Sequence, residues 1–180
     1  MSKIKNVKIY GAGSIGNHLA HASRRLNWQV DLCDISVKAL NRAKELIYPQ
    51  RYGKWDKNIR LINLSIENPK KKYDLIIIGT PPDTHIDIIK KVILEKPKYI
   101  LVEKPLCEPN KKNIQILKNL TIKKNTKFFV GYNHTVSRGI KYLISCINKN
   151  KIGKIISIDI DWREHWQGIL NAHPWLKGPN

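Results

Sequence analysis

The stretch Val7-Lys8-Ile9-Tyr10-Gly11-Ala12-Gly13-Ser14-Ile15-Gly16 joins a short apolar segment to a glycine-rich loop and the start of a helix. Residues 7–10 are predicted to form a buried strand, and residues 14–27 carry apolar side chains at helical spacings of three and four. A G-x-G-x-x-G loop between a strand and a helix is typical of dinucleotide-binding folds. The inner face predicted for this helix consists of Ile15, Leu19, Ala22 and Leu26.

Predicted strands and helices alternate after this loop. Further strands are predicted at 29–34, 59–64, 74–78, 99–102 and 127–130, and helices at 36–47, 83–94, 110–120 and 136–149. The run at 74–78 is the clearest strand, because an unbroken apolar run is typical of a strand buried on both faces. We expect Pro49 to end the helix 36–47, with an irregular segment at 48–56. The alternation predicts an α/β fold, a Rossmann doubly wound parallel sheet.

The glycine loop and the second strand together predict the cofactor. The glycines allow a tight turn, a close approach to the pyrophosphate and close helix–strand packing, while the first helical turn offers unpaired N–H groups to the anion. Asp34 ends the second strand, near the spacing of about 20 residues expected for a ribose-binding carboxylate. Its charge would repel a 2′-phosphate, so NAD is favoured over NADP. The residues predicted to bind NAD here are Gly11, Gly13, Ser14, Ile15, Gly16 and Asp34.

Composition excludes several other classes of function. The net charge of +19 comes from lysines dispersed over every predicted element, and no element interleaves basic and aromatic residues, so no nucleic-acid partner is expected. No apolar run approaches the roughly 20 residues of a membrane span, and no secretory signal precedes the first strand. Three scattered cysteines favour a reducing cytoplasm. The histidines lack metal-ligand spacing, so no metal site is expected.

Three further motifs follow predicted strands, at the sheet edge where open α/β sheets bind their ligands. They are Gly79-Thr80-Pro81-Pro82 with the nearby His85, Glu103-Lys104-Pro105, and Gly131-Tyr132-Asn133-His134. Together with the glycine loop, these motifs resemble the Gfo/Idh/MocA family of sugar and cyclitol oxidoreductases. The resemblance extends over essentially the whole chain.

The resemblance implies an NAD-dependent oxidoreductase that transfers hydride between the nicotinamide and a hydroxyl of a sugar or nucleotide sugar. It implies that Glu103 contacts the nicotinamide-side ribose and that Lys104 is the catalytic residue at the substrate. The Lys104–Pro105 bond is often cis in such relatives. Further cofactor contacts are implied for Thr80, Pro81, Pro82 and His85, and substrate contacts for Lys104, Asn133, Arg163 and His165.

A physical argument also supports Lys104. An ammonium beside an oxidised nicotinamide meets a like charge, which favours the neutral amine needed to accept a proton, although Glu103 opposes this effect. The alternative is a lysine paired with a surface carboxylate. Two other functions stay open: a non-catalytic NAD-binding or sensor protein, and a redox-neutral NAD-dependent sugar lyase or hydrolase of the same family.

The pattern changes near the end of the chain. Residues 154–162 alternate apolar and polar side chains, which predicts a strand with one buried face. We therefore expect residues 1–133 to form the NAD-binding Rossmann domain, and 134–180 a connecting helix and the first strand of an incomplete α+β substrate and dimerisation domain. The family's partner histidine for the lysine belongs to the missing part, so we expect little or no turnover. The unpaired apolar strand face predicts a homo-oligomer or self-association.

Overall fold

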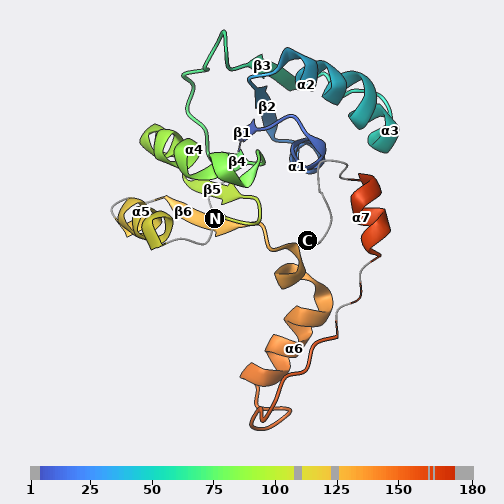
Figure 1. The fold of residues 1–180 in the computed structure, drawn as a ribbon, viewed down its shortest axis with the longest axis vertical. Coiled ribbons are helices and arrows are strands. Elements are labelled where there is room, and N and C mark those ends of the chain that lie inside the picture. Colours follow the sequence, from blue (N-terminus) through green and yellow to red (C-terminus); the bar gives the residue numbers. More distant parts are fainter. Residues whose placement is uncertain (1–4, 108–110, 123–125, 162, 164, 173–180) are drawn as a thin grey trace. The chain divides into compact units, whose positions relative to one another are not determined.

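A computed structural model describes residues 5–107, 111–122, 126–161, 163 and 165–172 (Figure 1). The chain divides into two compact units, Met1–Asn133 and His134–Asn180. Trp162, at the end of the predicted last strand, lies outside the described residues.

The first unit contains the predicted Rossmann sheet. Six parallel strands lie in the order β3-β2-β1-β4-β5-β6. Their bounds are β1 Asn6–Tyr10, β2 Gln29–Asp34, β3 Ile59–Asn63, β4 Leu75–Ile78, β5 Tyr99–Val102 and β6 Lys127–Val130. The predicted strands up to residue 130 are therefore confirmed, with differences of one residue at some ends.

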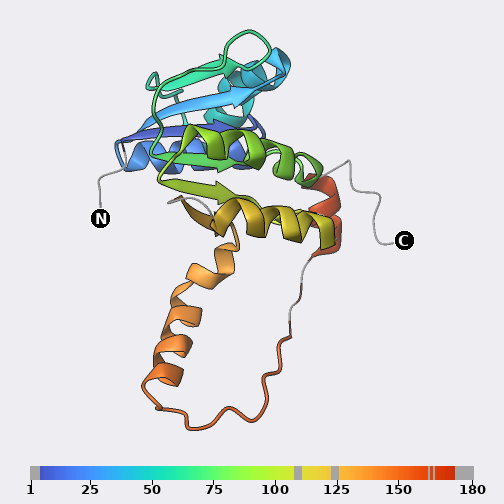
Figure 2. The same cartoon turned by 90° about the vertical axis from the view of Figure 1, so that its left-hand side faces the viewer.

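Helices cover both faces of this sheet. α4 and α5 lie on one face and α1 on the other (Figure 2). Two hydrophobic clusters fill the two interfaces, one around Leu32 and Ala20 of α1, the other around Ile76 and Ile89 of α4. The bounds are α1 Ser14–Arg25, α4 His85–Val92 and α5 Lys111–Ile122, with short 3-10 turns at Pro82–Thr84 and Ile93–Glu95 beside α4.

The buried face of α1 differs from the predicted one. Small or polar residues face the sheet, whereas Ile15 is 44% and Leu26 57% exposed. A Cβ atom on Gly16 would lie 1.8 Å from the carbonyl oxygen of Gly11, so the helix approaches the loop that follows β1 more closely than any side chain at this position allows. Leu19 alone of the four predicted residues packs against the core, so apolar periodicity indicated the buried face only in part. The buried residues of α1 are Gly16, Asn17, Ala20 and Ser23.

The helix predicted to end at Pro49 continues beyond it. α2 spans Val37–Arg42, a π-helical turn follows at Ala43–Ile47, and α3 spans Tyr48–Tyr52. Pro49 lies in the first turn of α3. The N–H groups of a first helical turn have no partner within the helix, so a proline there removes no hydrogen bond. The predicted irregular segment at 48–56 was therefore wrong as far as Tyr52.

The predicted strand at 154–162 does not form among the described residues of the second unit. It contains a 3-10 turn at Asn133–Val136, which begins at the last residue of the first unit, and the helices α6 Arg138–Asn148 and α7 Trp166–Ala172. Residues 154–161 pair with no other described segment, and Ile156 is 97% exposed. A strand exists only where a neighbour bonds its N–H and C=O groups. The alternating pattern indicated a local preference, but no partner strand is present among the described residues.

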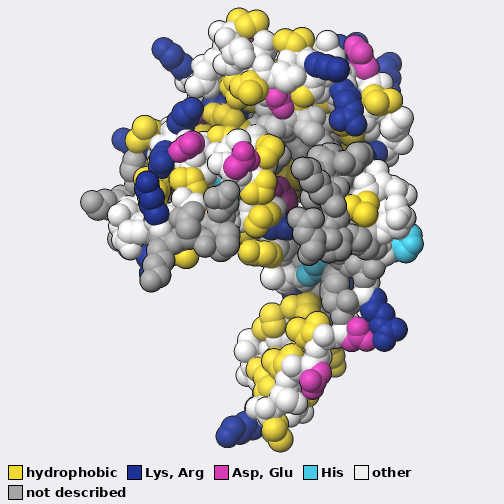
Figure 3. All heavy atoms as spheres, viewed as in Figure 1, with side chains coloured by type: hydrophobic (Ala, Val, Ile, Leu, Met, Phe, Trp, Pro, Cys, Tyr) yellow, Lys and Arg dark blue, Asp and Glu magenta, His cyan; other side chains and the backbone are white. Residues whose placement is uncertain are grey.

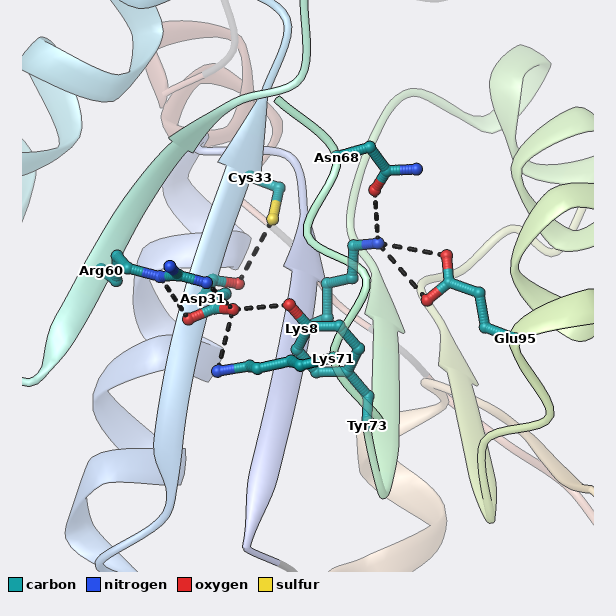
Figure 4. Close-up of polar contacts among 8 residues, drawn as sticks. All are labelled: Lys8, Asp31, Cys33, Arg60, Asn68, Lys71, Tyr73 and Glu95. Atoms are coloured by element: carbon teal, nitrogen blue, oxygen red, sulfur yellow. Dashed lines mark hydrogen bonds and ion pairs between the residues drawn. The ribbon is translucent and has the colours of Figure 1, made fainter. Parts of the chain in front are cut away.

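A polar network lies buried on the sheet face that α4 also covers. Lys8 of β1 is fully buried, and its Nζ atom donates to Asn68 Oδ1 at 2.8 Å and to Glu95 Oε1 at 3.1 Å. Asp31 of β2 lies directly beside Lys8 in the register of the two strands. It accepts hydrogen bonds from the hydroxyl of Tyr73 at 2.5 Å and from the guanidinium of Arg60 (Figure 4). Lys71 Nζ lies 3.0 Å from the same carboxylate.

The β3–β4 connection covers the buried charges with side chains instead of a helix. Residues 64–74 connect β3 to β4 without a helix, and Asn68, Lys71 and Tyr73 from this connection reach the buried charges. A buried charge is tolerated only when it is paired and hydrogen-bonded. The connection therefore has to adopt one path over the sheet to satisfy Lys8 and Asp31.

Replacement of Asp31 should destabilise the protein in a pH-dependent way. Burial alone would raise the pKa of Asp31, but hydrogen bonds from Arg60, Tyr73 and Lys71 outweigh burial and lower it. A lowered pKa in the folded state stabilises the fold above the ordinary value of about 3.9, and this contribution is lost as pH falls through the folded-state pKa. We expect Asp31→Asn to lower the free energy of unfolding by about 2–3 kcal/mol at neutral pH.

Urea unfolding at a series of pH values measures this effect. Asp87→Asn is the control, because the Asp87–Lys90 pair is exposed and solvent screens it, so its loss should change the free energy of unfolding far less. Equal stability of the two variants at neutral pH, or a difference that does not shrink on acidification, would contradict the role of the network.

Candidate cofactor site

The sheet register brings the predicted site segments to one edge. Tyr10 at the end of β1 lies opposite Cys33 and Ile78, and the ladder continues through Val102 to Val130. Because all the strands are parallel, the segments that follow them emerge on the same side. These segments are 11–16, 34–36, 79–82, 103–105 and 131–133.

The glycine loop holds the ends of β1 and β4 close together. Gly11 has a φ of +98°, and a Cβ atom on it would lie 2.8 Å from the carbonyl oxygen of Gly79. The Gly11 N–H donates to the Cys33 carbonyl oxygen at 2.8 Å, and the Gly79 N–H donates to the Tyr10 carbonyl oxygen at 2.9 Å. Only glycine combines this φ with this close approach.

The start of α1 fits a diphosphate. Gly13 is the N-cap, no side chain caps the helix, and the first turn carries no acidic residue. A Cβ atom on Gly13 would meet nothing within 4 Å, so the backbone is open to a ligand there. Ser14 and Ile15 complete the first turn and are both partly accessible. Uncapped N–H groups at a helix start attract an anion.

Asn17 supports the loop from inside the protein. It is fully buried, and its Nδ2 atom donates to the carbonyl oxygens of Gly13 at 3.2 Å and Ala12 at 3.3 Å. Its Oδ1 atom is buried without a hydrogen-bond partner among the described residues. The sequence analysis did not predict this residue. A polar side chain directly after Gly16, on a helix packed against the sheet, could have indicated a hydrogen bond to the loop.

Asp34 is tied to the glycine loop. Its Oδ2 atom accepts a hydrogen bond from the Ala12 N–H at 2.8 Å, and its Oδ1 atom accepts one from the Ser36 N–H at 2.9 Å. A carboxylate has about four acceptor positions, so this one can still accept from ribose hydroxyls. No lysine or arginine among the described residues forms an ion pair with it. A 2′-phosphate would therefore meet an unneutralised carboxylate.

His85 lies beneath the surface of the site, between the loop that follows β4 and the loop that follows β5. The residue is fully buried, with Nε2 2.8 Å from the carbonyl oxygen of Thr80 and Nδ1 3.1 Å from that of Leu106. The loops that follow β4 and β5 are thereby held together. This corrects the expected role: His85 is a positioning residue for the loop of Thr80, Pro81 and Pro82, with no surface facing a ligand.

Glu103 and Lys104 lie where β5 ends. The Glu103 carboxylate packs on Gly131, because a Cβ atom on that glycine would lie 2.8 Å from Oε1. Lys104 is exposed, and no carboxylate among the described residues pairs with it, so the surface-pair alternative receives no support. The Lys104–Pro105 peptide bond is cis.

The remaining predicted substrate residues make local contacts. Asn133 is exposed just beyond β6. In the second unit, Arg163 Nη2 donates to Asp161 Oδ2 at 2.8 Å, and His165 Nδ1 accepts from the Gly168 N–H at 3.2 Å. Substrate binding by the exposed Asn133 and by Arg163 and His165, which have these local partners, stays a prediction.

The surface shows no concentrated basic patch on the face drawn in Figure 3. Lysine and arginine side chains are scattered there among apolar and neutral ones (Figure 3). Among the described residues, every helix falls short of the length and apolarity that a membrane span requires. The same residues contain no group of three or more potential metal ligands.

A family model described as an oxidoreductase family with an NAD-binding Rossmann fold matches residues 5–132. Comparison with curated protein sequences finds no significant match. The WlbA dehydrogenase from Bordetella pertussis, solved with NADH and UDP-GlcNAcA, aligns with a TM-score of 0.64 and 16% identity, over 85% of this chain and 44% of that one. Myo-inositol 2-dehydrogenase from Lactobacillus plantarum aligns with a TM-score of 0.63 and 19% identity, over 86% and 44%.

Scyllo-inositol dehydrogenase from Lactobacillus casei, solved with NAD(H) and scyllo-inositol, aligns with a TM-score of 0.57 and 17% identity, over 85% of this chain and 43% of that one. At these identities the alignments show a shared fold. This chain spans less than half the length of each of the three structures.

The contact between Gly131 and Glu103 predicts a selective loss of affinity. A methyl group at position 131 would displace the carboxylate from its place against the glycine. If Glu103 binds the nicotinamide-side ribose, Gly131→Ala and Glu103→Gln should each weaken NAD binding by about 5- to 10-fold, which is the loss of about one charge-assisted hydrogen bond. Both variants should bind ADP, which lacks that ribose, as the parent does.

Isothermal titration calorimetry with NAD and ADP separates these effects. Gly139→Ala is the matched control, because a Cβ atom there meets nothing within 4 Å. Equal losses for NAD and ADP in Gly131→Ala would indicate general damage to the sheet edge and would refute the specific contact.

Proposed function

Because the chain belongs to the Gfo/Idh/MocA oxidoreductase family, we propose that its residues supply the NAD-binding part of an oxidoreductase that acts on a hydroxyl of a sugar or nucleotide sugar. The single observation that supports this most is the shared sheet edge. There the glycine loop follows β1, Asp34 ends the neighbouring strand β2, and Glu103-Lys104-Pro105 follows β5, which is separated from β1 by β4 alone.

Each residue at this edge has a separate task in the proposal. The first turn of α1 binds the pyrophosphate, and Asp34 accepts hydrogen bonds from the adenosine ribose. Glu103 orients the ribose next to the nicotinamide. The cofactor, when bound, supplies the hydride chemistry. Lys104 moves the proton of the substrate hydroxyl at its Nζ atom, which is exposed and unpaired among the described residues.

The wider setting is also proposed. Asn133, Arg163 and His165 would contact the substrate, and the protein would form a homo-oligomer in the cytoplasm. Exposed isoleucines at 155–160 favour self-association, and the three cysteines are free thiols, as a reducing compartment allows.

Cofactor choice depends on Asp34. We expect the protein to bind NAD at least about ten-fold more tightly than NADP, because a carboxylate beside a 2′-phosphate costs more than about 1.4 kcal/mol. Asp34→Asn keeps the shape of the side chain and removes its charge, so it should reduce this preference mainly by improving NADP binding. Calorimetry with both dinucleotides gives the ratio. A ten-fold preference of the parent protein for NADP would refute the role of Asp34.

Lys104 distinguishes an enzyme from a binding protein. Lys104→Ala should keep NAD affinity within about two-fold, yet lower NADH formation from inositols or nucleotide sugars by about 100-fold or more, the usual contribution of a positioned acid–base group. Lys57→Ala is the control, because Lys57 is exposed and precedes β3 at the opposite end of the strands. Little or no NADH formation is expected of this chain itself, so the test is the ratio between the two proteins. NADH formation that is the same in Lys104→Ala and in the parent protein would contradict the role of Lys104.

A further inference from the structure

The helical segment that precedes β3 places the charged side chain of Arg51 beside the start of α1, next to the glycine loop. The π-helical turn Ala43–Ile47 leads into α3, which packs on α1. The Tyr52 hydroxyl lies 2.6 Å from His18 Nδ1, and the ring of His21 stacks on that of Tyr52 with centroids 3.9 Å apart. The Tyr48 hydroxyl lies 3.2 Å from His21 Nδ1. These contacts fix α3 along the side of α1.

Arg51 extends from this fixed helix toward the start of α1. Its Nη1 atom donates to the carbonyl oxygen of Ser14 at 3.2 Å. Ser14 is the first residue of α1, directly after the N-cap Gly13. The guanidinium is exposed and pairs with no carboxylate among the described residues.

Because Arg51 is bonded to the first residue of α1, its guanidinium lies within about one helical turn of the first N–H groups of this helix. One turn of an α-helix rises about 5.4 Å, which is less than the Debye length of about 8 Å at physiological ionic strength. The first turn of α1 carries no acidic side chain that could neutralise Arg51. One hydrogen bond to Ser14 uses only one of the five N–H donors of the guanidinium.

We propose that Arg51 is a further cofactor-binding residue, which attracts and holds the diphosphate of the dinucleotide at the start of α1. The proposal rests on the proposed function, because it assumes that NAD binds at the glycine loop. The helix start supplies backbone N–H groups, and Arg51 supplies the full positive charge that this loop itself lacks. Asp34 accepts hydrogen bonds from the adenosine ribose, and Arg51 adds affinity for any nucleotide that carries the diphosphate.

Charge-removing variants test the proposal. Arg51→Gln should weaken NAD and ADP binding by about 3- to 10-fold at low salt, with a smaller ratio at high salt because the interaction is screened. Arg51→Lys should restore most of the affinity. Adenosine, which has no phosphate, should bind the parent and Arg51→Gln equally.

Arg25→Gln is the matched control, because it removes the same charge from the opposite end of α1, about 16 Å away along the helix. It should change NAD affinity by less than about two-fold, since that distance exceeds the Debye length. Equal NAD affinity of Arg51→Gln and Arg25→Gln, in a parent protein that binds NAD, would overturn the role of Arg51 alone. A parallel loss for adenosine would also overturn it, and failure of the parent to bind NAD would overturn the proposed function as well.

Discussion

The start of α1 packs very closely on the glycine loop that follows β1, and this packing determines where the site residues lie. A Cβ atom on Gly16 would lie 1.8 Å from the Gly11 carbonyl oxygen, so only glycine allows this crossing of loop and helix. The same approach places the uncapped start of α1 above the junction of β1 and β4. The helix therefore directs its partial positive charge at the edge where the other strand-end motifs lie.

The motifs at this edge are joined to one another rather than independently placed. Asp34 bonds the glycine loop through the Ala12 N–H, and His85 lies against the carbonyl oxygens of Thr80 and Leu106. Gly131 leaves room for the Glu103 carboxylate. A site built from such contacts is organised before a ligand arrives, which reduces the entropy that binding has to overcome. It also means that a substitution in one loop changes its neighbour.

Local sequence patterns predicted the sheet well and the tertiary contacts less well. Buried parallel strands such as 74–78 are continuous apolar runs, so their pattern does not depend on context. The face of α1 depends on how near the sheet lies, and periodicity carries no information on that distance. The segment 154–161 needed a partner strand that the described residues do not contain. The charges of Lys8 and Asp31 inside predicted strands were a signal of the buried network, but their partners come from distant segments.

NAD is expected to bind at the sheet edge around the start of α1. Titration of the isotopically labelled protein with NAD, followed residue by residue in amide NMR spectra, tests it most directly. We expect the largest shifts at the amides of Gly13, Ser14 and Ile15, with further shifts at Glu103, and none at Lys57 or Gly139. Shifts confined to other surfaces, or no shifts at saturating NAD, would contradict the claim.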